Sequence, residues 1–257
     1  MSKVVVKVGS NVLTREDGTL DVTMVSSLVD QIAYLRKVGY EIILVTSGAV
    51  ACGRSILGGA GNLDSVEQRQ VFSAVGQVRL MDLYSTLFHN YGIQVGQVLT
   101  MKENFAPGKA YSNQKGCMEA MLRSGVLPIV NENDTVCITE LMFTDNDELS
   151  GLIADMMGAH NLVILSDIEG LYNGLPGAEG TSVIRKVLPG EDISSYIVKA
   201  GSKAGRGGMQ SKAGTAALAA SRGIRVLIAC GKHPNMLVDV LERPDEVVFT
   251  EFVPAVC

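Results

Sequence analysis

The stretch KVVVKVGSN, residues 3–11, sets the pattern of the fold. Residues 3–8 form a short β-branched run typical of a buried strand, and a small polar turn, Gly9-Ser10-Asn11, follows it directly. Short apolar runs of this kind alternate with helical patterns along the chain. Such alternation predicts a mainly parallel sheet that is covered by helices on both faces.

The other elements follow from hydrophobic periodicity. Apolar residues at three- and four-residue steps from Val22 to Leu35 predict a helix that ends at Gly39. Further helices are predicted over 65–91, 109–124, 147–159 and 210–222, and further strands over 41–46, 93–99, 126–130, 162–165 and 226–228.

Composition excludes several classes of protein. With 47% apolar and 19% charged residues the chain has enough material for a large core and is not a disordered chain. The net charge of −5 argues against nucleic acid as a partner. The odd count of five cysteines, with no CxxC, argues against a disulfide framework, and with three scattered histidines it argues against a structural zinc site. The sequence shows no signal peptide and no membrane span, so we expect a cytoplasmic protein.

Polar residues gather where the predicted strands end, and ligands of parallel sheets bind beyond those ends. The runs concerned are 9–11, 47–49, 131–134 and 166–167. Each run alone is as consistent with an ordinary turn or helix cap as with a binding site. Together they predict a single site at one edge of the sheet.

Lys7 stands inside an apolar strand, where an unpaired ammonium group would be costly to bury. Its head group must either reach water or meet an anion. The backbone N–H groups of the neighbouring turn 9–11 favour a phosphate as that anion.

The glycine-rich run GRGGMQSK, residues 205–212, leads into a predicted helix with Lys212 in its first turn. Backbone donors, a helix N-terminus and an ammonium group together suit a polyphosphate. The run is neither a Walker A loop nor GxGxxG, and the protein-kinase HRD and DFG motifs are absent. A nucleotide site here therefore belongs to another family.

Two further polar runs, NEND (131–134) and FTDNDE (143–148), suit a small polar substrate. In this interpretation Asp134 holds an ammonium group and Asn146 a carboxylate or phosphate oxygen. A solvated loop and a capped helix start remain the alternative for either run taken alone.

Six segments now stand in a recognisable order, and together they resemble the glutamate kinases of the amino acid kinase family from Val4 to about Gly231. The segments are VVKVGSNVLT (5–14), VTSGAVACG (45–53), VNENDTV (130–136), TDNDELSG (144–151), LSDIEGLY (165–172) and GRGGMQSKAGTA (205–216).

The resemblance implies a three-layer α/β/α sandwich around a mainly parallel sheet. It implies transfer of the γ-phosphoryl group of ATP to the side-chain carboxylate of L-glutamate, the first step of proline biosynthesis, with Mg²⁺ carried by ATP and proline as feedback inhibitor. It also implies a homo-oligomer, dimer or tetramer, for which the helix 65–91 is a candidate interface. We expect one domain over 1–257, with the glutamate site mainly in its first half, the nucleotide site mainly in its second, and no C-terminal PUA domain.

The resemblance also implies roles for single residues. Lys7, Asp147 and Lys212 would be catalytic, with Asp147 orienting the two ammonium groups, and Ser47, Asp134 and Asn146 would bind glutamate. The expected nucleotide-binding residues are Gly9, Ser10, Gly48, Ser166, Asp167, Arg206, Gly207, Gly208, Met209 and Lys212. Arg206 replaces a threonine that is common in the family, and Thr144 replaces a frequent glycine.

Two groups of alternatives stay open. Acetylglutamate kinase, aspartokinase, carbamate kinase and nucleoside monophosphate kinases would share the phosphate machinery, but only a free amino-acid substrate needs an acidic partner in the run 131–134. A non-catalytic amino-acid or nucleotide sensor would keep the fold alone. Such a sensor would be free to lose Lys7, Asp147 or Lys212, and all three are present.

Overall fold

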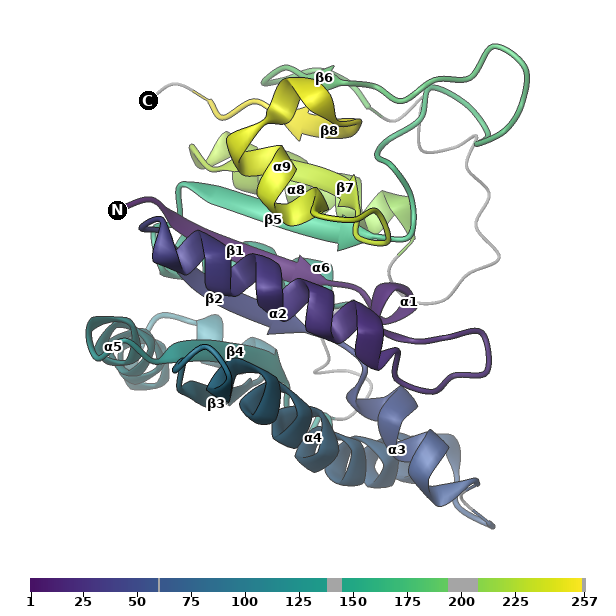
Figure 1. Ribbon diagram of the computed structural model, residues 1–257, viewed down its shortest axis with the longest axis vertical. Helices are drawn as coiled ribbons and strands as arrows, with labels where there is room; N and C mark the ends of the chain where they lie inside the picture. The colour runs from purple at the N-terminus through teal and green to yellow at the C-terminus, as the bar shows by residue number, and fades with distance from the viewer. Residues whose placement is uncertain (60, 138–144, 194–207, 256–257) are drawn as a thin grey trace.

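The computed structural model describes residues 1–59, 61–137, 145–193 and 208–255. In this part of the chain eight strands form one sheet in the order β3-β4-β2-β1-β5-β7-β8-β6 (Figure 1). The strands are β1 (Lys3–Val8), β2 (Glu41–Thr46), β3 (Val95–Thr100), β4 (Leu127–Glu132), β5 (Asn161–Ser166), β6 (Lys186–Val187), β7 (Arg225–Cys230) and β8 (Phe249–Phe252).

The predicted mainly parallel sheet is confirmed. β1 lies in the middle of the sheet, parallel to β2 on one side and to β5 on the other. The exception is β8, which runs antiparallel to β7 and carries the short β6 at the sheet edge. β6 and β8 were not predicted, since each is too short to show a clear periodicity.

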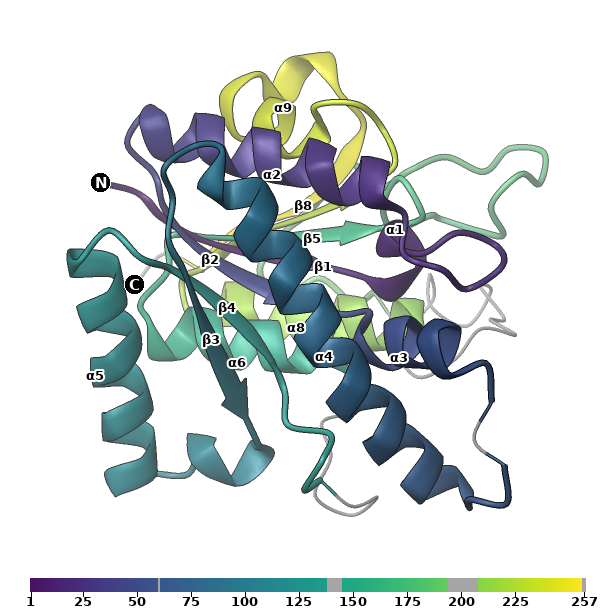
Figure 2. The same ribbon diagram turned by 60° about the horizontal axis from the view of Figure 1, so that its bottom comes forward.

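Helices cover both faces of the sheet, so the three-layer sandwich is confirmed (Figures 1 and 2). One apolar core joins the sheet to α2, α4 and α9, and the other joins it to α5, α6 and α8. The helices are α1 (Ser10–Leu13), α2 (Val22–Lys37), α3 (Ala49–Leu57), α4 (Ser65–His89), α5 (Lys109–Arg123), α6 (Asn146–Met156), α8 (Met209–Ser221) and α9 (Met236–Glu242), with 3₁₀ turns η1 (Lys102–Phe105) and η2 (Pro244–Glu246).

Two boundaries differ from the sequence prediction in ways that bear on the site. β4 runs on to Glu132, so Asn131 and Glu132 are buried strand residues and not the start of a loop. Polar residues at the end of a strand look like a turn in the sequence, which explains the error. α6 begins at Asn146 and ends at Met156, shortly before Gly158, whose positive φ of 58° stops the helix.

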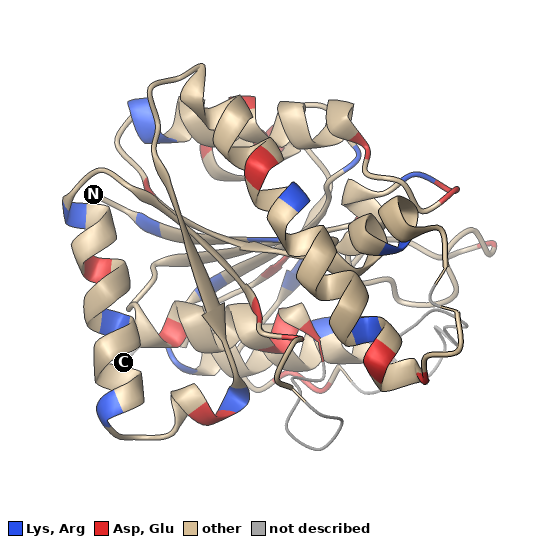
Figure 3. Ribbon diagram, turned by 90° about the horizontal axis from the view of Figure 1, so that it is seen from below, with Lys and Arg blue, Asp and Glu red and all other residues tan. Residues whose placement is uncertain are grey.

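Charged residues of both signs are spread over the molecule (Figure 3), and the cysteines described are free thiols. On the side of the molecule seen in Figure 3, positively and negatively charged segments are mixed along the helices. Cys52, Cys137 and Cys230 are buried free thiols, and Cys117 is an exposed one. No helix in the described ranges is both long and apolar enough to cross a membrane.

The helices α3 and α4 pack against each other at backbone contact distance. A Cβ atom on Gly76 would lie 1.8 Å from the carbonyl oxygen of Ala49, and one on Gly53 would lie 1.8 Å from that of Phe72. No real Cβ atom approaches an oxygen so closely, so both positions need glycine. This crossing holds the N-terminal half of α4 next to the turn after β2.

We predict that Gly76→Ala lowers the free energy of unfolding by about 1–3 kcal/mol, because the new methyl group forces the two helices apart. Urea denaturation would measure it. The matched control is Gly116→Ala on α5, where nothing lies within 4 Å of the new Cβ atom. The control should gain about 0.5–1 kcal/mol. Equal changes in the two variants would contradict the close crossing.

Candidate active site

A cavity of about 920 Å³ opens where the carboxyl ends of β1, β2, β4 and β5 meet the first turns of α3, α6 and α8. Every predicted site residue in the described ranges lines this cavity, and only Arg206 and Gly207, like Thr144, lie outside those ranges. The members are Lys7, Gly9, Ser10, Ser47, Gly48, Asp134, Asn146, Asp147, Ser166, Asp167, Gly208, Met209 and Lys212. The four strand ends therefore line one cavity, and its use as a binding site stays a prediction.

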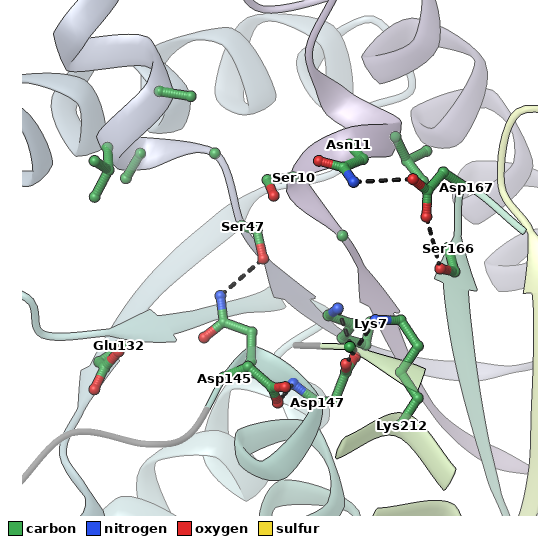
Figure 4. A pocket seen from close by; sticks show the side chains of 18 of the residues that line it. Lys7, Ser10, Asn11, Ser47, Glu132, Asp145, Asp147, Ser166, Asp167 and Lys212 are labelled. Carbon is green, nitrogen blue, oxygen red and sulfur yellow. Dashed lines mark hydrogen bonds and ion pairs between the residues drawn. The ribbon is translucent and has the colours of Figure 1, made fainter. Parts of the chain in front are cut away.

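Asp147 stands between two ammonium groups at the centre of the cavity (Figure 4). Its Oδ1 lies 2.5 Å from Nζ of Lys7, and its Oδ2 lies 3.2 Å from Nζ of Lys212. The side chain of Asp147 is fully buried, while those of Lys7 and Lys212 are 6% and 12% exposed. Of the two fates open to Lys7 in the sequence, the structure shows the one in which its head group meets an anion, here a carboxylate.

Strand and helix geometry explain how the three residues meet. Side chains alternate along β1, so Lys7 shares with Val5 the face that packs on α6. Asp145 caps α6 by accepting hydrogen bonds from the backbone N–H groups of Asp147 (2.8 Å) and Glu148 (3.0 Å). Asp147 thus sits in the first turn of α6, where the helix dipole favours a negative charge.

The amide nitrogen of Asn146 joins three segments of the cavity wall. Its Nδ2 donates to the carbonyl oxygen of Thr46 (2.9 Å), to Oγ of Ser47 (2.9 Å) and to Oδ1 of Asn131 (3.1 Å). The donor that a direct role in substrate binding would use is therefore engaged with the protein. Ser47 accepts in this arrangement and keeps its own proton to donate.

An acidic corner closes one end of the cavity. The guanidinium group of Arg69 on α4 donates from Nε to Asp134 Oδ1 (2.8 Å) and from Nη2 to Glu132 Oε2 (3.1 Å). The hydroxyl group of Ser73 donates to Oδ2 of Asp134 (3.1 Å). Both carboxylates are almost fully buried.

Asp167 lies on the opposite side, beyond the end of β5 (Figure 4). Burial raises its pKa, but hydrogen bonds from Asn11 and Ser166 and the charge of Lys212 lower it more, so the pKa lies below its usual value. Asp167 is therefore ionised at neutral pH and holds Asn11 in place at 2.9 Å.

Glycine is required in the turn after β2. Gly48 has a φ of 102°, a left-handed conformation that side chains disfavour, and it is the residue that precedes the first turn of α3. The segment that follows Gly48 is the helix α3. The interpretation of the turn 47–49 as an anion site required a helix at this place.

A family model described as "Amino acid kinase family" matches residues 2–230 of the chain. The chain belongs to the amino acid kinase family. Among curated relatives, a protein named glutamate 5-kinase from Bacteroides thetaiotaomicron is 58% identical over 99% of this chain and 71% of its own length. Proteins of the same name from Chlorobaculum tepidum (48%, covering 91% of this chain and 65% of the relative) and Symbiobacterium thermophilum (41%, covering 93% and 92%) are also similar.

Solved structures of other kinases share the fold of this amino acid kinase. Carbamate kinase from Giardia lamblia bound to AMP-PNP superimposes with a TM-score of 0.72 at 15% identity, over 99% of both chains. UMP kinase from Ureaplasma parvum gives 0.65 at 14% identity, over 98% of both. At these identities the likeness concerns the fold.

The side chains that α4 contributes to the cavity wall were not predicted from the sequence. Arg69 and Ser73 lie on one face of that helix, four residues apart, and Gln77 continues the face and accepts a hydrogen bond from Asn131 at 3.0 Å. The available signal was a polar stripe at helical spacing in 69–77, but such a stripe is usually a solvated face. Only the α3–α4 crossing shows that it is turned inward.

We predict that Asp147→Asn lowers the free energy of unfolding by about 3–5 kcal/mol, because it removes the buried carboxylate charge that pairs with both Lys7 and Lys212. Urea denaturation would measure the loss. The matched control is Asp155→Asn on the same helix, which removes an exposed pair with Arg222 and should cost at most about 1 kcal/mol. A loss no larger than that of the control would contradict the central role of Asp147.

Proposed function

We propose that the chain transfers the γ-phosphoryl group of ATP to the side-chain carboxylate of L-glutamate, giving γ-glutamyl phosphate and ADP. The observation that carries the proposal is the layout of the cavity, with two buried ammonium groups around Asp147 at its centre and an acidic corner at one end. The curated relatives named glutamate 5-kinase support the same reaction.

The chemistry asks little of the protein beyond position and charge. A carboxylate is already a nucleophile at neutral pH, so its oxygen attacks the γ-phosphorus without a general base, and the bond from that phosphorus to the β-phosphate oxygen breaks. The transferring group carries negative charge on its oxygens. Lys7 and Lys212 stabilise that charge, and Asp147 keeps their head groups fixed in the required positions.

The nucleotide occupies the side of the cavity at the ends of β1 and β5 and the start of α8. In the proposal its phosphates meet the backbone N–H group of Gly48 and the start of α8 at Gly208 and Met209. Arg206 and Gly207 continue that run, with Ser10, Ser166 and Asp167 beside it. Gly9 lies beside the phosphates, with its own N–H group donated to the carbonyl oxygen of Leu165 (3.1 Å).

Mg²⁺ enters with ATP and is held by phosphate oxygens and water, as is usual for this ion, and when bound it neutralises charge on the phosphates. No three His, Cys, Asp or Glu side chains form a candidate metal site within the described ranges. The proposal assigns no protein ligand to the ion, because phosphate oxygens and water hold it.

L-Glutamate occupies the other side of the cavity, at the ends of β2 and β4 and the start of α6. Its ammonium group meets Asp134, and its carboxylates lie toward the hydroxyl group of Ser47 and the segment that Asn146 holds together. The two substrates thus share one domain. Self-association through α4 and inhibition by proline remain predictions from the family resemblance, and a cytoplasmic location remains a prediction from the sequence.

Trapping the acyl phosphate with hydroxylamine tests the reaction and the substrate together. The wild-type protein is incubated with ATP, Mg²⁺ and either L-glutamate, N-acetyl-L-glutamate or L-aspartate, and the hydroxamate is measured. We expect product with L-glutamate only. Product with another acid would assign a different acceptor, and no product from folded protein that binds ATP would favour the sensor alternative.

We predict that Lys212→Ala lowers kcat by about 100- to 1,000-fold, because it removes charge stabilisation from the transferring phosphoryl group. Steady-state kinetics with saturating L-glutamate and ATP would measure it, with the exposed Lys37→Ala on α2 as the control. A kcat within threefold of the wild-type value would refute the role assigned to Lys212.

We predict that Asp134→Ala raises the KM for L-glutamate by at least about 30-fold and changes kcat much less, because the ammonium group of the substrate loses its anion. The same assay gives both constants. An unchanged KM would show that the ammonium group binds elsewhere.

A further inference from the structure

Arg69 is one cation shared by two buried carboxylates. Nη2 of its guanidinium group lies 2.7 Å from Oδ1 of Asp134 and 3.1 Å from Oε2 of Glu132, and its Nε also donates to Asp134. The two carboxylate side chains are 5% and 7% exposed. A planar fork of N–H donors is suited to hold two carboxylates at a fixed separation.

Each carboxylate also has a neutral donor. Ser73 donates its hydroxyl hydrogen to Asp134. The thiol of Cys137 hydrogen-bonds Glu132, and burial, together with the charges of Glu132 and Asp134, raises the pKa of that thiol to about 11. Cys137 is therefore protonated and uncharged at neutral pH.

The charges of this group do not cancel. Two carboxylates, one guanidinium group, one hydroxyl group and one thiol leave a formal negative charge in the cavity wall. An ammonium group of a substrate is the species that would neutralise it. Without the guanidinium group the two carboxylates would repel each other and move apart.

We propose that Arg69 is a positioning residue that determines specificity for a free amino group on the acceptor. It acts through Asp134 and Glu132, because its donors fix both carboxylates and hold Asp134 where it meets the ammonium group. This inference rests on the proposed function. It adds a residue of α4 to the acceptor site, although the residues expected from the sequence all lie in strand-end segments and α6.

The arrangement of α4 supports an indirect role. Nε and Nη2 of Arg69 donate to Asp134 and Glu132, so these two donors face the protein. Arg69 and Ser73 are one helical turn apart and meet the same Asp134 from one face of α4. The contact of Gly76 with Ala49 keeps that face against the end of β4.

The test is the kinetics of Arg69→Gln with L-glutamate in the hydroxylamine assay. We expect the KM for L-glutamate to rise about 10- to 100-fold, because Asp134 loses the guanidinium donors that hold it at the ammonium site. We expect kcat to stay within about threefold, because the Lys7–Asp147–Lys212 group is untouched. Arg69→Lys should recover part of the KM, and the control Arg79→Gln, an exposed residue of the same helix, should change neither constant.

Two truncated acceptors separate the proposed role from direct contact. 4-Aminobutyrate keeps the ammonium group and lacks the α-carboxylate, whereas glutarate keeps both carboxylates and lacks the ammonium group. Measured as competitive inhibitors, 4-aminobutyrate should bind Arg69→Gln more weakly than wild type by about the factor found for L-glutamate. Glutarate should bind the two proteins equally.

Several results would overturn the inference. An unchanged KM for L-glutamate in Arg69→Gln would do so, as would an equal loss of glutarate binding, which would indicate contact with the α-carboxylate. A parallel fall of kcat without recovery in Arg69→Lys would indicate a structural role. Absence of hydroxamate from the wild-type protein with L-glutamate would instead refute the proposed function, whatever the variant does.

Discussion

Asp147 forms ion pairs with two ammonium groups, 2.5 Å from Nζ of Lys7 and 3.2 Å from Nζ of Lys212, and its own side chain is fully buried. The three residues come from β1, α6 and α8, so their meeting depends on the order of the strands and on where two helices begin. Because the three groups are buried, removing the charge of any one of them would take an ion-pair partner from a buried charge and lower the free energy of unfolding. The sheet, the Asp145 cap of α6 and the two apolar cores hold the side chains of Lys7, Asp147 and Lys212 in place.

The second constraint is the close approach of α3 and α4. The glycines at the crossing let backbone meet backbone, and this turns a polar face of α4 toward the end of β4. One helix thereby supplies the cation and the hydroxyl group that hold the acidic corner. In the proposal Lys212 on α8 acts on phosphoryl transfer and Arg69 on α4 acts on acceptor recognition, which is why variants of these two residues are expected to affect different kinetic constants.

Much of this arrangement was predictable from the sequence, for a physical reason. Apolar strands that end in polar residues predict the sheet and the edge at which the cavity lies. A lysine inside an apolar strand, Lys7, predicts an anion near its head group. The inward face of α4 was not predictable, because Arg69 and Ser73 look like a solvated stripe until the packing of Gly53 and Gly76 is known. The antiparallel β8 also depends on tertiary pairing with β7, which no local pattern encodes.

The central claim is that the ammonium pair stabilises the transferring phosphoryl group more than the bound substrates. Its most direct test compares the affinity of wild type and Lys212→Ala for two complexes with L-glutamate and Mg²⁺. One contains AMP-PNP, a mimic of the bound nucleotide, and the other ADP with aluminium fluoride, a mimic of the group in transfer. The account predicts a loss of at least about 100-fold for the fluoride complex and less than about 10-fold for AMP-PNP. Equal losses for the two complexes would contradict it.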